Sequence, residues 1–189
     1  RHPSYQLRQL RVIRGSLSTE ACTMLVHAFV SSKLDYCNSL LAGLNDELIN
    51  RLQSVLRSSA RLILKKRRFD PVSDDMRKRL HWLPIRQRIQ FKLGLLVFKC
   101  LHGLAPPYLC DMISQVRSSD YSSRLRSAAR GDLNVPRTHS VRMGPRGFAV
   151  AGPKLWNSLS QELKNPDISL TTFKSLLKFE LFKRAYDAN

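Results

Sequence analysis

Apolar residues recur at helical spacing along most of this chain. The spacing predicts helices over the ranges 4–14, 19–41, 45–65, 73–81, 84–102, 107–116, 153–163 and 169–185. Residues 117–147 are instead rich in Ser, Arg and Gly, and their only candidate strand is 133–135. We therefore expect a mostly α fold, a helical bundle with a loop-rich insertion and at most one short β element.

Local end signals support several of these helices. Ser18 or Thr19 can cap the helix that continues to Leu41, and Asn45 can cap the next one. Proline is tolerated in the first turn of a helix, so Pro84 and Pro153 are each expected to open one. We expect four segments, which are a thumb-like helical segment 1–68, a helical segment 69–116, a basic connector 117–147 and C-terminal helices 148–189 that pack on the preceding ones.

The 45–65 helix separates an apolar side from a basic side. Its expected core residues are Leu48, Leu52, Val55, Leu56, Leu62 and Ile63, and the opposite side carries Arg51, Arg57, Arg61 and Lys65. Lys66, Arg67 and Arg68 continue this charge beyond the helix end. The 84–102 helix carries two apolar faces and a third face with Arg88, Lys92 and Lys99.

The basic charge is large and clustered. The 189 residues carry 32 Lys or Arg against 14 Asp or Glu, a net charge of +18, and 43% are hydrophobic, enough for a core. Residues 51–92 hold 13 Lys or Arg and 3 Asp, so this stretch carries +10 of the net charge. Such clustering favours a polyanion-binding surface, with RNA, DNA or an RNA–DNA hybrid as partner, over a ribosomal-type or merely soluble basic surface. The candidate nucleic-acid-binding residues are Arg51, Arg57, Arg61, Lys65, Lys66, Arg67, Arg68, Arg77, Lys78, Arg79, Arg88 and Lys92.

Paired carboxylates could hold the two metal ions of a polymerase, and Asp74-Asp75 is such a pair. The run 72–79 has no aromatic residue before the pair and is followed by basic residues instead of an apolar strand. We therefore interpret Asp74 and Asp75 as helix N-capping residues and predict no catalytic site in the chain.

Neither histidines nor cysteines form a metal-binding or nucleophilic motif. The five His and four Cys show no HxxxH or CxxC spacing, so we expect no metal and no other cofactor. Cys22 and Cys37 are expected on core faces, and all four cysteines are expected to be reduced in an intracellular protein. No apolar run approaches the ~20 residues that span a bilayer, and we expect no membrane partner.

Two further groups of residues have both a functional and a structural interpretation. Trp82 and Trp156 could stack on bases, but each lies in an apolar run, which favours core packing. Arginines of the connector could bind a nucleic-acid backbone or belong to a solvated loop, and neither interpretation is favoured. These arginines are Arg124, Arg126, Arg130, Arg137, Arg142 and Arg146.

Four blocks, at 29–41 (FVSSKLDYCNSLL), 81–89 (HWLPIRQRI), 98–109 (FKCLHGLAPPYL) and 153–159 (PKLWNSL), carry a family resemblance. In this order and at these separations they resemble the C-terminal part of the polyprotein of LINE-type non-LTR retrotransposons of the chicken-repeat and jockey-like group. That part follows the catalytic palm of the reverse transcriptase. The resemblance runs from about Tyr5 to about Ala185.

The resemblance implies thumb and post-thumb helices that grip the template–primer by its phosphates during target-primed reverse transcription. The palm and endonuclease parts of the same polyprotein would then be partners, in the cytoplasm and the nucleus. The chain begins with Arg1 and not Met, so we interpret the chain as a fragment of an RNA-directed DNA polymerase. The alternatives are a free-standing basic helical RNA- or DNA-binding or adaptor protein derived from such an element, and an autonomous enzyme, which the missing carboxylates disfavour.

Overall fold

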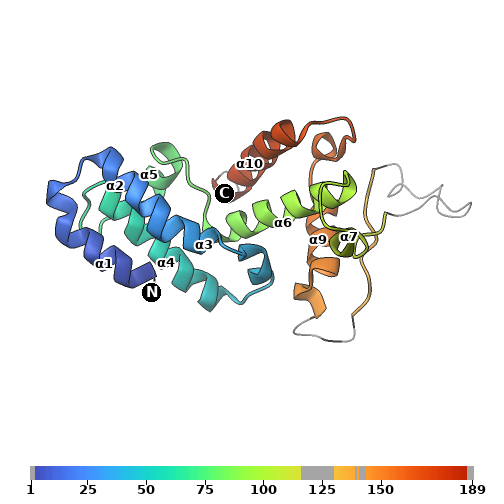
Figure 1. Cartoon of the computed structure of the whole chain (residues 1–189), viewed down its shortest axis with the longest axis horizontal. Helices are drawn as coiled ribbons and strands as arrows, with labels where there is room; N and C mark the ends of the chain where they lie inside the picture. The colour runs from blue at the N-terminus through green and yellow to red at the C-terminus, as the bar shows by residue number, and fades with distance from the viewer. Residues whose placement is uncertain (1–2, 116–129, 139, 141–143, 187–189) are drawn as a thin grey trace, which may run out of the picture. The chain divides into compact units, whose positions relative to one another are not determined.

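The structure is a computed structural model that describes residues 3–115, 130–138, 140 and 144–186. Described residues are mostly helical, which confirms the expected mostly α fold (Figure 1). The strand expected at 133–135 does not form. A single antiparallel bridge joins Gln115 to Leu133 there. Hydrogen bonds from side chains, and not a ladder of backbone hydrogen bonds, hold this segment.

The chain folds into two compact units. Unit 1 contains residues 3–38 and 44–88, and unit 2 contains 39–43 together with the described residues from 89 on. The long helix α6, Ile85–Leu101, begins in unit 1 and belongs to unit 2 from Ile89.

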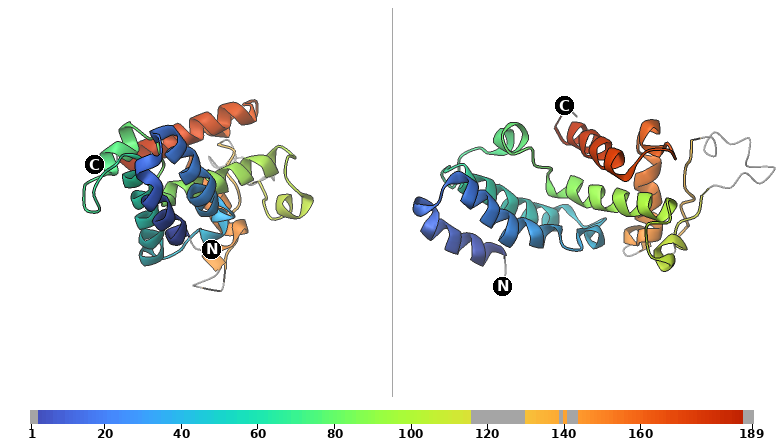
Figure 2. Two further views of the ribbon diagram at one scale, coloured as in Figure 1. Left: turned by 60° about the vertical axis from the view of Figure 1, so that its left-hand side comes forward. Right: turned by 45° about the horizontal axis from the view of Figure 1, so that its top comes forward.

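Unit 1 is built from short helices around one long one. Its helices are α1 (Pro3–Ile13), α2 (Thr19–Val26), the π-helix His27–Ser31, α3 (Ser32–Asp35), α4 (Asp46–Ile63) and α5 (Ser73–Lys78). Both predicted caps are confirmed, because Ser18 Oγ accepts from the N–H of Ala21 at 3.1 Å and Asn45 Oδ1 accepts from that of Leu48 at 3.2 Å. The helix α4 contacts α1, α2 and α5, and Figure 2 shows α1 and α4 side by side.

The helix expected to reach Leu41 ends earlier. Tyr36 is extended, Cys37 has a φ of 48°, and a separate 3-10 helix spans Asn38–Leu41. The Asn38 amide donates to Asp35 Oδ1 at 3.4 Å, which ties the chain back on itself at this break. Cys37 is therefore exposed, so the expectation of a core position there was wrong, whereas Cys22 is fully buried as predicted.

The core of unit 1 includes three of the six residues predicted for the apolar side of α4, and Leu52 and Val55 are half-buried. Leu56, Leu62 and Ile63 are buried, but Leu48 is 39% exposed and Ile49 is buried in its place. Leu48 lies in the first turn of α4. Trp82 is buried with an exposure of 6%, which confirms its core role.

Unit 2 packs α6, α9 (Phe148–Asn157) and α10 (Leu170–Tyr186), with the short helix α7 (Pro107–Cys110) and the 3-10 helices Gly144–Arg146 and Gln161–Lys164. The helix expected to open at Pro153 instead begins at Phe148, with Gly147 at its N-cap and Pro153 inside it. A Cβ on Gly152 would lie 2.9 Å from Val97 Cγ2, so glycine permits the close approach of α9 to α6. Hydrophobic spacing along α10 predicts that Leu170, Phe173, Leu177 and Leu181 point inward. The last three are fully buried, and Leu170 is half-buried.

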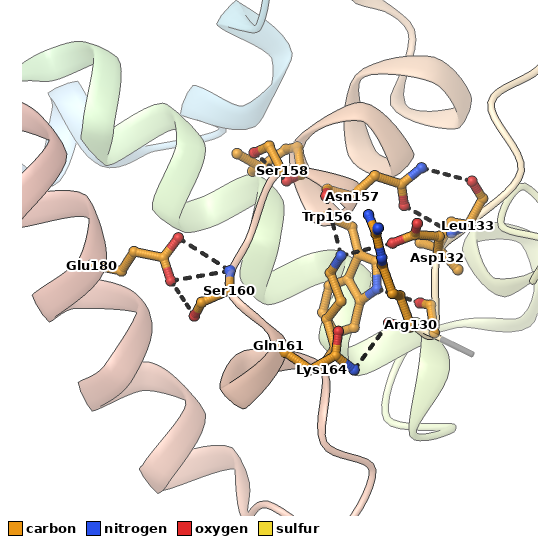
Figure 3. A network of polar contacts seen from close by, with 12 residues as sticks. Arg130, Asp132, Leu133, Trp156, Asn157, Ser158, Ser160, Gln161, Lys164 and Glu180 are labelled. Atoms are coloured by element: carbon orange, nitrogen blue, oxygen red, sulfur yellow. Dashed lines mark hydrogen bonds and ion pairs between the residues drawn. The ribbon is translucent and has the colours of Figure 1, made fainter. Parts of the chain in front are cut away.

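A polar network ties residues 130–133 to the end of α9 (Figure 3). Asn157 accepts from the N–H of Leu133 at 2.8 Å and donates to its carbonyl at 2.9 Å. Trp156 Nε1 donates to the Gly131 carbonyl at 3.0 Å, which confirms a structural role for this buried tryptophan. Lys164, whose side chain is 3% exposed, forms an ion pair with Asp132 at 2.7 Å.

Candidate nucleic-acid interface

The C-terminus of α4 turns sharply where the basic run begins. The N–H of Lys66 donates to the Arg61 carbonyl at 2.9 Å and that of Lys65 to the Leu62 carbonyl at 3.4 Å. This is the Schellman pattern, whose left-handed position usually holds glycine. Here Lys65 occupies it with a φ of 54°. A lysine therefore occupies a position whose left-handed backbone conformation disfavours every residue with a side chain.

Arg14 closes the same helix end from another segment. Its guanidinium donates to the carbonyls of Leu62 at 2.8 Å and Ile63 at 2.9 Å, and to that of Leu17 at 2.7 Å. The last carbonyls of a helix have no partner inside it and carry the negative end of its dipole. Arg14 satisfies two of them and is buried, with an exposure of 8%. A fixed positive charge therefore lies just below the surface at this point.

A hollow of about 380 Å³ opens beside this helix end. Its lining has six cationic side chains, one leucine and no acidic residue: Arg11, Arg14, Arg61, Leu62, Lys65, Lys66 and Arg68. A second hollow, of about 230 Å³, shares Arg11 and is lined also by Leu7, Arg8, Ser54, Val55 and Ser58. Both lie where α1 runs along α4.

Two of the lining cations are held by contacts within the protein. Lys66 Nζ bonds to Asp75 Oδ2 at 2.5 Å and to the Pro71 carbonyl at 2.8 Å, and this hydrogen bond from Lys66 holds the pKa of Asp75 below its usual value. Arg61 Nε donates to the Asp70 carbonyl at 2.9 Å.

Arg11, Lys65 and Arg68 are exposed and form no ion pair with any described residue. We call these three residues the basic triad. Together with the buried charge of Arg14, they leave the hollow with an uncompensated positive charge.

Sequence reasoning identified part of this site. It named Arg61, Lys65, Lys66 and Arg68, which the structure brings together, and it missed Arg11 and Arg14. Periodicity carried no signal for the role of Arg14, because its partners lie 48 and 49 positions away.

Other predicted binding residues on α4 and beyond it are placed differently. Arg51 pairs with Glu47 at 2.8 Å, which offsets its charge, although both side chains are well exposed. Arg57 and Arg67 are exposed and lie outside both hollows.

On α5 the cations face carboxylates. Lys78 lies 4.0 Å from Asp74, and Arg79 lies 3.5 Å from Asp75. Arg77 is half-buried. The expected capping role of the two aspartates was wrong in detail, because Val72 holds the N-cap position with no side-chain bond. Asp74 and Asp75 lie in the first turn, where their charge still complements the helix dipole.

Arg88 makes its contacts within unit 1. Its side chain is 13% exposed, pairs with Asp35 at 2.8 Å and donates to the Leu83 carbonyl at 2.8 Å. Its guanidinium also lies 5.7 Å from the centre of the Trp82 ring. Lys92 is exposed but belongs to unit 2.

The connector arginines divide into two groups. Arg130 and Arg137 are exposed, and Arg146 is half-buried and donates to the Ala42 carbonyl at 3.2 Å. Arg124, Arg126 and Arg142 lie outside the described residues.

Among the described residues, no group of three or more His, Cys, Asp or Glu is arranged to hold a metal ion. All four cysteines are free thiols, and burial raises the pKa of Cys22 and, to about 11, that of Cys100. Among the described helices, none has the length and apolar character needed to cross a bilayer.

Comparison with protein-family models, with curated proteins and with solved structures gives no match for this chain.

Proposed function

We propose that unit 1 binds nucleic acid through the phosphate backbone, with the basic triad and the hollow beside it as the main contact surface. The observation that carries this proposal is the lining of that hollow, which has six cations and no acid. A phosphate entering it would meet Arg11, Lys65 and Arg68 at the surface and the fixed charge of Arg14 beneath them. Release of condensed counterions from the nucleic acid would then supply much of the binding free energy.

Such binding is expected to be nearly independent of base sequence. Phosphate contacts fix position and orientation, whereas sequence is read by side chains that reach base edges in a groove. The lining of the hollow contains no Asn or Gln, the side chains best suited to paired adenine.

The resemblance to LINE-type reverse transcriptases suggests how this binding would be used. In such a polyprotein the chain would hold the template–primer, and another part would supply the catalytic carboxylates. Asp75 supports this division of labour, since its carboxylate is already bound to Lys66 and Arg79. We propose a non-catalytic, nucleic-acid-binding part of an RNA-directed DNA polymerase as the function of the chain.

Binding should weaken steeply with salt. Each neutralised phosphate adds about 0.9 to the slope of log affinity against log salt on a B-form duplex. The triad corresponds to about three phosphates, so the slope should be about −3, or roughly a 60-fold loss between about 50 and 200 mM salt. Fluorescence anisotropy with a labelled duplex measures this slope. A slope flatter than about −1, or a strong preference for one sequence at equal length, contradicts phosphate binding.

Replacing Lys65 with glycine should move stability and binding in opposite directions. A non-glycine residue in the left-handed conformation costs about 1 kcal/mol, so Lys65→Gly should raise the free energy of unfolding by about 0.5–1 kcal/mol. The same change removes one triad charge and should lower duplex affinity several-fold. Lys65→Ala is the matched control, because it loses the charge and keeps the strain. A glycine variant that is less stable than the wild type would show that the strain is absent.

A further inference from the structure

Phe69 stands out from the rest of the apolar side chains. It is 87% exposed, the highest value among the large apolar residues that the structure describes. A single exposed apolar residue is ordinary in a folded protein. Phe69, however, lies directly after the basic run Lys65–Arg68, three of whose four residues line the hollow.

The turn that carries Phe69 is fixed at both ends. The N–H of Arg67 donates to Asp70 Oδ2 at 2.8 Å, and the N–H of Asp70 donates to the Arg67 carbonyl at 3.3 Å. The next contacts anchor the turn to the rest of unit 1, because Arg61 binds the Asp70 carbonyl and Lys66 binds that of Pro71. The closed turn thus holds the backbone of Phe69 at the surface, so little backbone entropy remains to be lost when its ring meets a ligand.

The ring has a cation as its immediate neighbour. The Arg68 guanidinium lies 5.4 Å from the centre of the Phe69 ring, within cation–π range. Arg68 also lines the hollow. One side chain therefore connects an exposed aromatic face to the proposed phosphate site. Proteins that bind unpaired nucleic acid combine these two elements, an aromatic surface for a base and a cationic groove for the backbone.

We propose that Phe69 stacks on an unpaired base of a nucleic-acid strand whose phosphate occupies the hollow. This inference rests on the proposed function and specifies its ligand, a single-stranded or locally unpaired segment. In a continuous duplex the base faces are covered by their neighbours, so Phe69 has no surface to stack on. Unit 1 then binds an unpaired strand more tightly than a blunt duplex of equal phosphate number.

The test compares Phe69→Ala with Phe69→Tyr in the full chain. The probes are a 12-mer deoxyribonucleotide strand, the same strand as RNA, an abasic strand of equal length and a blunt duplex of matched phosphate number. Loss of one stacked base lowers affinity about 5-fold or more. We expect that loss for Phe69→Ala on the ordinary DNA strand, the RNA strand or both, and less than about a 2-fold change on the abasic strand and the duplex. Phe69→Tyr should bind like the wild type. The DNA and RNA arms show which sugar the site accepts.

The outcomes separate this inference from the proposed function. If no probe binds the wild type, the proposed function fails. If all probes bind but Phe69→Ala binds each as the wild type does, only the stacking inference is overturned. An equal loss on ordinary and abasic strands also overturns it, because stacking requires a base. A fifth arm uses phosphatidylserine–phosphatidylcholine vesicles, and vesicle binding that needs Phe69 while strand binding does not would assign the ring to a membrane surface instead.

Discussion

Reversing the basic triad, with Arg11, Lys65 and Arg68 each changed to Glu, should weaken nucleic-acid binding by about 100-fold or more near physiological salt. Three favourable phosphate contacts are lost, and three carboxylates then repel the backbone at the same place. The remaining hollow cations do not compensate, because Lys66 is already bound to Asp75, and Arg14 and Arg61 are bound to backbone carbonyls. Anisotropy titration with a labelled 12-mer strand and a duplex measures the loss.

The triad variant should remain folded. All three side chains are exposed, and exposed substitutions usually change stability by less than about 0.5 kcal/mol each. Circular dichroism and thermal melting check this. A triad variant that is folded and binds like the wild type would show that the hollow is not the contact surface.

A matched control reverses the same number of charges elsewhere. Lys154, Lys174 and Lys178 are exposed residues of α9 and α10 in unit 2. Changing all three to Glu alters the net charge by the same amount as the triad variant and should lower affinity only several-fold, through the long-range field. If the control loses as much affinity as the triad variant, binding depends on net charge alone and the assignment of a site is wrong.

Local signals predicted two helix caps and the core face of a third helix. The caps at Ser18 and Asn45 and the core face of α10 were predicted from residues within one or two turns of each other, and the structure confirms them. Predictions failed where the backbone departs from a regular helix. The left-handed Cys37 ends a helix that hydrophobic periodicity extended to Leu41, and the α9 helix forms around Pro153 instead of after it.

The candidate site was predicted only in part, because periodicity places a residue on a face and does not identify its partner. Arg88 shares a predicted polar face with Lys92, yet Asp35, 53 positions away, draws it into the interior of unit 1. Arg14 has no periodic signal, and its role follows from an α4 carbonyl 48 positions away. Phe69 could have been found from the sequence, since an aromatic residue at the end of a run of four cations is a pattern typical of strand-binding surfaces.

Removing the Asp132 carboxylate should destabilise unit 2 by about 3–5 kcal/mol. Asp132 is the ion-pair partner of Lys164, whose side chain is almost fully buried. Breaking a buried pair by removing one member leaves an uncompensated charge in the interior, and that costs about 3–5 kcal/mol. The Asn157 carbonyl at 3.1 Å would remain as a neutral acceptor for the ammonium group. It cannot balance the charge, so Asp132→Ala should strongly destabilise the packing of residues 130–133 against α9.

The two tryptophans allow this loss to be measured in the intact chain. Trp82 lies in unit 1 and Trp156 in unit 2, and both are buried. A Trp82→Phe background therefore leaves Trp156 as the fluorescence reporter of unit 2, and Trp156 is bonded to Gly131 beside the ion pair. Urea unfolding in this background should show a lower midpoint for Asp132→Ala. The exposed neighbour Glu162, changed to Ala, is the control and should shift the free energy of unfolding by less than about 0.5 kcal/mol.

A double replacement tests whether the charge is the cause. Asp132→Leu combined with Lys164→Met removes both ions and keeps apolar volume at the site. Replacing a buried ion pair by apolar residues of similar volume is often neutral or stabilising, so the double variant should recover most of the stability that Asp132→Ala loses. Recovery would establish that the buried Lys164 ammonium requires its carboxylate. A double variant as unstable as Asp132→Ala would instead trace the loss to the Asp132 side chain's other contacts, and a single variant within about 1 kcal/mol of the wild type would contradict the burial of the pair.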